Sequence, residues 1–206
     1  MQYKPHHYQE IATAMIVNHP HCALLLDMGL GKTVSTLTAI DLLLDRIEIA
    51  RVLIVAPKRV AEHTWPDEIR KWDHLQHLRT SVVLGSATKR IKALNTPADI
   101  YVINRENVEW LVDYYKQAWP FDMVVLDEST SFKNSQSKRW KAMRRVRRFI
   151  KRMVLLTGTP SSKGLIDLWA QVSLLDCGER LGQSLSAYRE RYFDPDQRSR
   201  TPVSYT

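Results

Sequence analysis

Cysteine is scarce in this chain, and the patterns typical of disulfide-bonded and zinc-binding proteins are missing. Only Cys22 and Cys177 occur among 206 residues, too few for a disulfide framework, so we expect a reducing compartment. The seven histidines show no metal-ligand spacing. We therefore expect neither a disulfide framework nor a zinc site.

Long apolar runs are missing too. No stretch approaches the length of a membrane-spanning helix, and the N-terminus lacks the charged and then apolar pattern of a secretory signal. Internal repeats and low-complexity tracts do not occur. We expect one large domain with no membrane partner, in the cytoplasm (the host cytoplasm if the source is a phage) or in the nucleus of a eukaryote.

Acidic residues are outnumbered, with 22 Asp and Glu against 30 Lys and Arg, which gives a net charge of +8 and favours an anionic partner. Most of the excess lies in residues 138–152. Apolar residues recur there near helical spacing, and arginines fill the other faces: Arg144, Arg145, Arg147 and Arg148. The segment suggests a DNA-binding helix. We favour a solvated amphipathic helix, because a run of charge specifies no groove or base.

Short apolar runs alternate with helix-compatible segments along the chain. Strands are expected near 22–27, 52–56, 80–84, 100–103, 123–127 and 152–157, and helices near 33–45, 60–73, 104–117, 137–149 and 164–175. This alternation predicts an α/β fold with a mainly parallel central sheet and helices on both faces. The first strand is expected to be buried on both faces.

The stretch LDMGLGKT at 26–33 follows the first expected strand and precedes a helix. Gly29 and Gly31 let the backbone curl so that N–H groups face an anion at the positive end of that helix. In such a loop Lys32 reaches the β/γ-phosphates and the Thr33 hydroxyl holds Mg²⁺. A strict phosphate loop has glycine where Leu26 stands. The residues expected to line the nucleotide are Met28, Gly29, Leu30, Gly31, Lys32 and Thr33.

Two more strand ends carry polar motifs. The run at 123–127 ends in Asp127 and Glu128, which fit an acid that orients Mg²⁺ and one that accepts a proton from the attacking water. An isolated acidic pair is more simply a solvated strand end, but the upstream loop reverses that preference. The run at 153–156 ends in Thr157-Gly158-Thr159-Pro160, which is either an ordinary turn or a third part of the site. Parallel strands bring all three ends to one edge.

Together these stretches resemble the first motor lobe of the Swi/Snf-type superfamily 2 helicases, DNA translocases that include chromatin remodellers. The similar segments are DMGLGKT at 27–33, APKRV at 56–60, WPDEIRKW at 65–72, DESTSFKN at 127–134, LTGTP at 156–160, LIDLWAQVSLLD at 165–176 and SAYRERYF at 186–193. The resemblance covers essentially the entire chain and implies a RecA-like P-loop domain that uses ATP and Mg²⁺.

The resemblance also implies roles outside the phosphate loop. Lys58 and Arg59 would contact one strand of duplex DNA through phosphates, largely independently of base sequence. Gln9 would contact adenine, with a surface helix position as the alternative. Thr157, Gly158 and Thr159 would couple the nucleotide to the DNA face. Thr130 stands where many members carry histidine, which leaves that coupling open. Trp65 and Trp72, seven residues apart, would share one helical face, where core packing is favoured over base stacking.

The family's motor has two stacked lobes, and no second series of strands and motifs follows Pro160. We expect residues 1–193 to form the first lobe and the polar, turn-rich residues 194–206 to be a linker. A second RecA-like lobe in cis would then supply an arginine that raises the rate about 10³ to 10⁵-fold. This chain alone is expected to hydrolyse ATP weakly or not at all.

Two other functions use some of the same features. A phosphate-loop GTPase or kinase would share the loop, but an Asn-Lys-x-Asp signature is missing and LTGTP fits neither class. A non-catalytic module that binds DNA or a partner protein, with a degenerate nucleotide site, would account for the positive charge and for Leu26.

Overall fold

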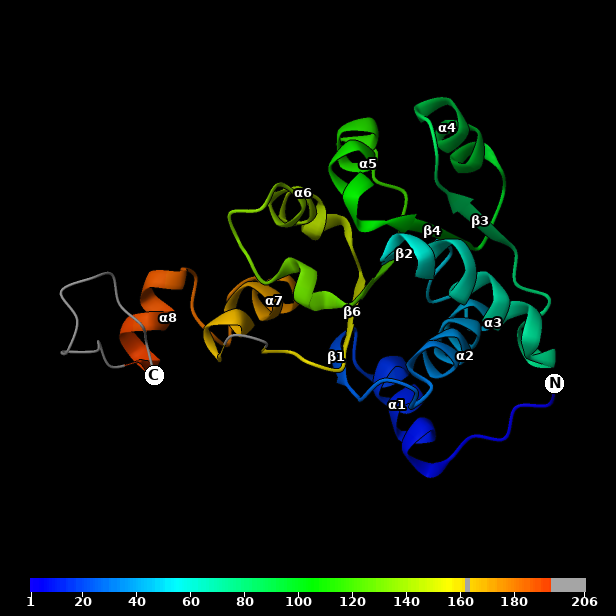
Figure 1. Cartoon of the computed structure of the whole chain (residues 1–206), viewed down its shortest axis with the longest axis horizontal. Helices are drawn as coiled ribbons and strands as arrows, with labels where there is room; N and C mark the ends of the chain where they lie inside the picture. The colour runs from blue at the N-terminus through cyan, green and yellow to red at the C-terminus, as the bar shows by residue number, and fades with distance from the viewer. Residues whose placement is uncertain (162–163, 194–206) are drawn as a thin grey trace.

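The computed structural model describes residues 1–161 and 164–193, and within them six parallel strands form one sheet (Figure 1). The strands are β1 (His21–Leu25), β2 (Val52–Ala56), β3 (Thr80–Val83), β4 (Ile100–Asn104), β5 (Met123–Asp127) and β6 (Arg152–Thr157). Their order across the sheet is β1-β6-β5-β2-β4-β3, and every pair is parallel. Each expected strand is present within two residues of its predicted bounds.

Helices cover both faces of this sheet. They are α1 (His7–Asn18), α2 (Lys32–Asp45), α3 (Trp65–Lys71), α4 (Ala87–Asn95), α5 (Val108–Tyr115), α6 (Lys138–Val146), α7 (Ile166–Asp176) and α8 (Leu185–Tyr192). On β2, Ile54 packs with α1, α2 and α3, whereas its neighbours Leu53 and Val55 pack with α4 to α7. Figure 1 shows these two layers, with α8 extending beyond them next to α7. The predicted α/β fold is confirmed.

The first strand, β1, lies at an edge of the sheet and is less buried than predicted. In the sheet formed by the described residues, β1 pairs with β6 alone. Cys22 and Leu24 are buried, but the side chain of Leu25 is 57% exposed. The central strands β2, β4 and β5 are buried at every position. Ala23 is partly buried against the opposite core cluster, so the expectation of burial on both faces holds only in part for β1.

The expected helix at 60–73 is divided. Residues Val60–Thr64 form a π-helical turn, in which Trp65 N–H bonds to the Val60 carbonyl, and α3 follows. Because Pro66 lacks a backbone N–H, it cannot donate the hydrogen bond that a continuous α-helix would have at this position. Trp72 follows α3 as its C-cap, with an extended backbone (φ −98°, ψ 123°), and both tryptophans pack against the same core cluster. Trp65 is fully buried, as core packing predicted.

One arginine of the basic segment is structural. Arg147 is only 6% exposed, and its guanidinium donates hydrogen bonds to the carbonyl oxygens of Ile150, Leu174 and Leu175. The last two carbonyls lie in the final turn of α7, where a helix lacks backbone donors and favours a cation. The solvated interpretation is therefore wrong for Arg147, although Arg145 and Arg148 are exposed.

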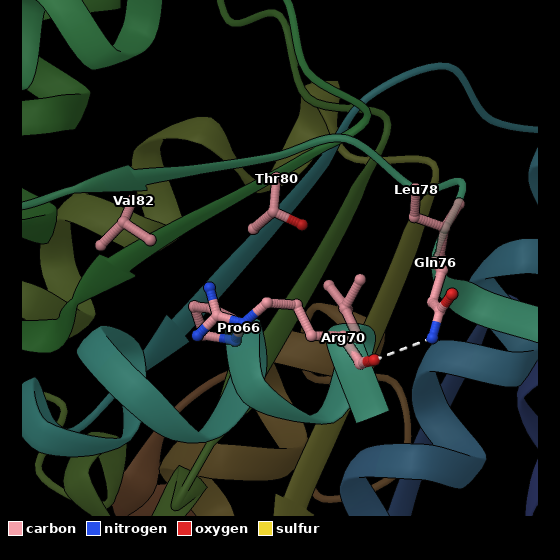
Figure 2. A pocket seen from close by; sticks show the side chains of 7 residues that line it. Pro66, Arg70, Gln76, Leu78, Thr80 and Val82 are labelled. Atoms are coloured by element: carbon pink, nitrogen blue, oxygen red, sulfur yellow. Dashed lines mark hydrogen bonds between the residues drawn. The ribbon is translucent and has the colours of Figure 1, made fainter. Parts of the chain in front are cut away.

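A hollow of about 480 Å³ lies between α3 and the edge strand β3 (Figure 2). Its lining residues are Pro66, Ile69, Arg70, Gln76, Leu78, Thr80 and Val82, none of them an expected site residue. Gln76 Nε2 donates to the Arg70 carbonyl oxygen at 3.0 Å and connects the loop before β3 to the end of α3.

Across residues 1–161 and 164–193, no helix has the length and apolar character needed to cross a membrane.

Candidate nucleotide-binding site

The three sequence motifs meet at one edge of the sheet. β6 lies between β1 and β5, with Leu25 paired in register to Thr157 and Asp127 to Leu156. The Leu26 N–H extends this contact by donating to the Thr157 carbonyl at 3.2 Å. A Cβ on Gly158 would lie 3.4 Å from the Leu26 carbonyl oxygen, so the loop after β6 lies against the loop after β1. The predicted convergence of the three strand ends is therefore present.

The loop at 26–33 turns sharply through two glycines. Gly29 and Gly31 have φ values of 81° and 75°, which a side chain at either position would strain. Around Gly29 the space is open, since an added Cβ would find no heavy atom within 4 Å. At Gly31 an added Cβ would lie 2.2 Å from Gln9 Nε2. Gly31 is also the N-cap of α2, whose first turn directs free backbone N–H groups toward the loop.

Lys32 lies across this loop. Its Nζ donates to the carbonyl oxygens of Leu26 at 2.6 Å and of Asp27 at 2.9 Å. Leu26, where a strict phosphate loop has glycine, is half-buried and packs against the core beside α1 and α2. Its side chain is thus part of the core, while its carbonyl holds Lys32. The loop combines a curled backbone, a helix N-terminus and one ammonium group, as an anion site requires.

Asp127 is held by a buried tryptophan. Trp65 Nε1 donates to Asp127 Oδ2 at 3.0 Å, and the Glu128 N–H donates to Oδ1 at 3.0 Å. Burial raises the pKa of the Asp127 carboxyl above its ordinary value, and the nearby Glu128 adds to the rise. The bond from Trp65 and the charge of Lys32 oppose this shift in pKa. Trp65 therefore supports the ionised form of the carboxylate that is expected to bind Mg²⁺.

Glu128 has an unusual backbone. Its φ of 53° and ψ of 59° are left-handed, and the 3₁₀ turn Ser129–Phe132 begins directly after it. A non-glycine residue in this conformation costs about 1 to 3 kcal/mol and persists only where its surroundings hold it. The chain thus turns at Glu128, directly after β5.

The remaining predicted residues flank this centre. Thr157 is buried, and its Oγ1 accepts a hydrogen bond from the Thr159 N–H at 3.1 Å, which closes the turn at Gly158. Gln9 is buried against the loop and is not a surface helix residue: its Oε1 accepts from His6 N–H at 2.9 Å and its Nε2 lies 3.4 Å from the Leu30 carbonyl.

The two basic residues expected at DNA lie further along the same edge. Lys58 and Arg59 are exposed and follow the carboxyl end of β2, which neighbours β5. They are therefore separated from the loop at 26–33 by the ends of β6 and β5. The structure brings the phosphate loop, the acidic pair and Thr157 together and leaves this basic pair beside them.

Sequence reasoning missed two further contacts of the site. It placed Trp65 in the core but did not predict its hydrogen bond to Asp127. It included Gln171 in a helix without a role, although this side chain is 3% exposed and bonds to two of the motif loops. A signal was present in Gln171 itself, since an uncharged polar residue on the apolar face of a helix needs hydrogen-bond partners when buried.

Comparisons with known proteins agree with this geometry. The SNF2-related domain model matches residues 9–198. The protein p41 of Acyrthosiphon pisum secondary endosymbiont phage 1 is 40% identical over 198 residues, which cover 93% of this chain and 43% of p41. The DNA repair and recombination protein RAD54B of Gallus gallus is 30% identical over 201 residues, which cover 94% of this chain and 21% of RAD54B.

A solved structure is similar as well. The SWI2/SNF2 ATPase core of Sulfolobus solfataricus, in complex with dsDNA, matches with a TM-score of 0.79 and 25% identity, over 92% of this chain and 39% of that one. The present chain spans less than half the length of each of these three relatives. The sequence resemblance to Swi/Snf-type motors is confirmed, and the chain belongs to the SNF2-related domain family.

Proposed function

We propose that this chain is the ATP-binding lobe of a DNA-dependent ATPase that couples ATP hydrolysis to movement on duplex DNA. The observation that carries the proposal is the meeting of the 26–33 loop, the acidic pair after β5 and the Thr157 turn at one sheet edge. In open parallel sheets, ligands bind outside the carboxyl ends of the strands. We further propose that residues 1–193 form this lobe, that 194–206 are a linker outside the described residues, and that a second RecA-like lobe acts in cis.

The residues at this edge of the sheet have separate roles in binding and hydrolysing ATP. Backbone N–H groups at the start of α2 bind phosphate oxygens, with Met28, Gly29, Leu30 and Gly31 curled around them. Lys32 exchanges its carbonyl partners for the β/γ-phosphates. Thr33 and Asp127 hold Mg²⁺, which when bound stabilises the charge that develops on the transferred phosphoryl group. Glu128 orients the attacking water or accepts its proton.

Gln9 and the basic pair act at the margins of this centre. Gln9 is fixed against Leu30 and presents its amide edge to adenine. Lys58 and Arg59 contact DNA phosphates, so binding is largely independent of base sequence. Thr157, Gly158 and Thr159 run from the end of β6 to Pro160, whose carbonyl bonds to α7, and transmit the nucleotide state toward DNA. The Sulfolobus relative solved with dsDNA supports a duplex as the partner.

Hydrolysis by this lobe alone should be slow. An arginine supplied from a second lobe contributes about 10³ to 10⁵ in the rate of related phosphoryl transfers. Nucleotide binding, in contrast, requires only the residues of this chain. The two activities are therefore measured separately.

The test compares Mg-ATP with Mg-GTP on the wild-type chain and on the Lys32→Ala variant. We expect the wild type to bind ATP in preference to GTP and the variant to lose at least about tenfold in ATP affinity, since a charged hydrogen bond contributes about 1.5 to 3 kcal/mol. Equal competition by GTP would indicate a nucleotide site of another class. DNA binding without any ATP binding would instead indicate the non-catalytic module.

A further inference from the structure

One buried amide connects two of the motif loops. Gln171, in the middle of α7, accepts a hydrogen bond on Oε1 from Ser129 Oγ at 2.8 Å. Its Nε2 donates to the Pro160 carbonyl at 2.8 Å and to the Asp167 carbonyl at 3.0 Å. Because both partners of Nε2 are carbonyl oxygens, which can only accept, the orientation of the amide is determined by its surroundings.

The two loops that Gln171 joins belong to different parts of the site. Ser129 directly follows Glu128, at the start of the 3₁₀ turn after β5. Pro160 directly follows Thr157–Thr159, at the end of β6. The two strands are neighbours in the sheet, but the bond between their loops passes through a helix that follows both in sequence.

Ser129 and Gln171 are almost inaccessible to solvent, with exposures of 1% and 3%. A buried hydroxyl or amide that loses its partner therefore gains no water in exchange and costs about 1 to 3 kcal/mol. A shift of either loop away from α7 breaks at least one of these bonds. The contact thus favours one relative position of the two loops over others.

A second contact joins the same segment to the same helix. Lys133, just after the 3₁₀ turn, forms an ion pair with Asp167 at 3.0 Å, and the carbonyl of Asp167 is one of the acceptors of Gln171. The segment 129–133 is thereby attached to α7 at both of its ends. The left-handed backbone of Glu128 lies directly before this attachment, where strain requires support.

We propose that Gln171 is a positioning residue, which through Ser129 holds Glu128 in its hydrolytic position and through Pro160 ties that position to the Thr157–Thr159 turn. This proposal rests on the proposed ATPase function. Gln171 touches neither nucleotide nor water in this scheme, so it affects the rate of hydrolysis and leaves the affinity for Mg-ATP, which depends on the 26–33 loop, nearly unchanged.

Three variants separate the contacts of the amide. Gln171→Leu removes both links at similar volume. Gln171→Glu keeps an acceptor for Ser129 and removes the donor to Pro160. Ser129→Ala removes only the bond near Glu128. The matched control is Ser173→Ala, a buried serine on the same helix whose Oγ bonds within α7 to the Ala170 carbonyl at 3.0 Å.

The first measurement is single-turnover hydrolysis of Mg-ATP with duplex DNA by the complete protein that carries this chain, together with the ATP dissociation constant. We expect Gln171→Leu to slow hydrolysis about tenfold or more, with affinity within about twofold of wild type. Ser129→Ala should be slower than Ser173→Ala, and the Ser129→Ala/Gln171→Leu double variant no slower than Gln171→Leu, because the two residues share one bond. Hydrolysis by Gln171→Leu at the wild-type rate, or additive losses, would overturn the proposal.

The second measurement needs no hydrolysis. Hydrogen exchange is followed without nucleotide in the segments 128–134 and 157–160. We expect Ser129→Ala to accelerate exchange in 157–160 as well as in its own segment, and Ser173→Ala to accelerate neither. An effect of Ser129→Ala confined to 128–134 would refute the link. A wild-type protein that never hydrolyses ATP would refute the proposed function, while the exchange result still decides the link between the loops.

Discussion

Replacing Trp65 with phenylalanine should reveal how much the indole supports Asp127. Trp65 is fully buried and donates from Nε1 to Asp127 Oδ2 at 3.0 Å. Phenylalanine removes this donor and part of the ring volume. The matched control is Trp119→Phe, because Trp119 is also buried and its Nε1 has no hydrogen-bond partner within residues 1–161 and 164–193. The control loses ring volume without losing a bond to a carboxylate.

The magnitude follows from the charge of the acceptor. A hydrogen bond to a charged group contributes about 1.5 to 3 kcal/mol, and a neutral one about 0.5 to 1.5 kcal/mol. Burial already raises the pKa of Asp127, and the Trp65 bond opposes that rise. Removing the bond should therefore raise the pKa of Asp127 further, because the indole N–H favours the ionised carboxylate.

The free energy of unfolding depends on pH because Asp127 binds its proton with a different pKa in the folded and unfolded states. Since the folded pKa of Asp127 lies above its unfolded value, the free energy of unfolding falls as pH rises through the interval between the two. In Trp65→Phe the folded pKa of Asp127 is higher, so this interval extends to higher pH. The variant is therefore destabilised most, relative to the wild type, above the interval, where Asp127 is ionised. The difference becomes smaller at acid pH, where Asp127 is protonated in both proteins.

The assay is urea denaturation of the wild type and both variants across pH. We expect Trp65→Phe to be less stable than Trp119→Phe by about 1.5 to 3 kcal/mol above the raised pKa, with a smaller difference in acid. Binding of Mg-ATP by Trp65→Phe should also require a higher pH than in the wild type. Equal losses in both variants at every pH would refute the role given to the indole.

Three further substitutions test other contacts. Gly31→Ala places a Cβ 2.2 Å from Gln9 Nε2, whereas Gly29→Ala has a similar φ but open space around it. We therefore expect Gly31→Ala to weaken ATP binding and stability more than Gly29→Ala. Equal losses in denaturation and ATP titration would show that backbone strain alone matters. Arg147→Met leaves the Leu174 and Leu175 carbonyls without their donor, so it should lower the free energy of unfolding by about 3 kcal/mol or more in thermal denaturation. The control Arg145→Met, which loses only an exposed pair with Asp113, should cost about 1 kcal/mol or less. Similar melting temperatures for the two variants would contradict the role of Arg147 at the end of α7. Lys58→Ala combined with Arg59→Ala should weaken duplex binding equally for unrelated DNA sequences, with ATP affinity unchanged. The slope of log affinity for DNA against log salt concentration should become shallower by about one for each lost phosphate contact. An unaltered slope would show that these residues do not contact DNA.

The strands and the motif positions were predictable because their signals are local. Central strands such as β2 and β5 are uninterrupted apolar runs, and each motif follows its strand directly in sequence. Parallel topology then brings the motif ends together without further information. The placement of Asp127 beside Thr157 and the 26–33 loop could be inferred on these grounds alone.

The parts that could not be predicted depend on packing between distant segments. Helix α1 was missed because it buries Gln9 and Thr13 along with its apolar residues, and α4 because Leu94 is its one buried residue. The pairing of β1 with β6 joins strands that lie far apart in sequence. The bonds from Trp65 to Asp127 and from Ser129 to Gln171 span 62 and 42 residues, distances over which no local pattern specifies a partner.

The central claim, that this edge of the sheet hydrolyses ATP when DNA is bound, is tested most directly by Glu128→Gln. The measurement is ATP turnover by the complete protein, with and without duplex DNA, for the wild type and this variant. The account predicts DNA-stimulated turnover in the wild type and a loss of about 10² or more in the variant, which still binds Mg-ATP, because a general base contributes about 10² to 10⁴. Wild-type turnover that DNA does not stimulate, or unchanged turnover in Glu128→Gln, would contradict it.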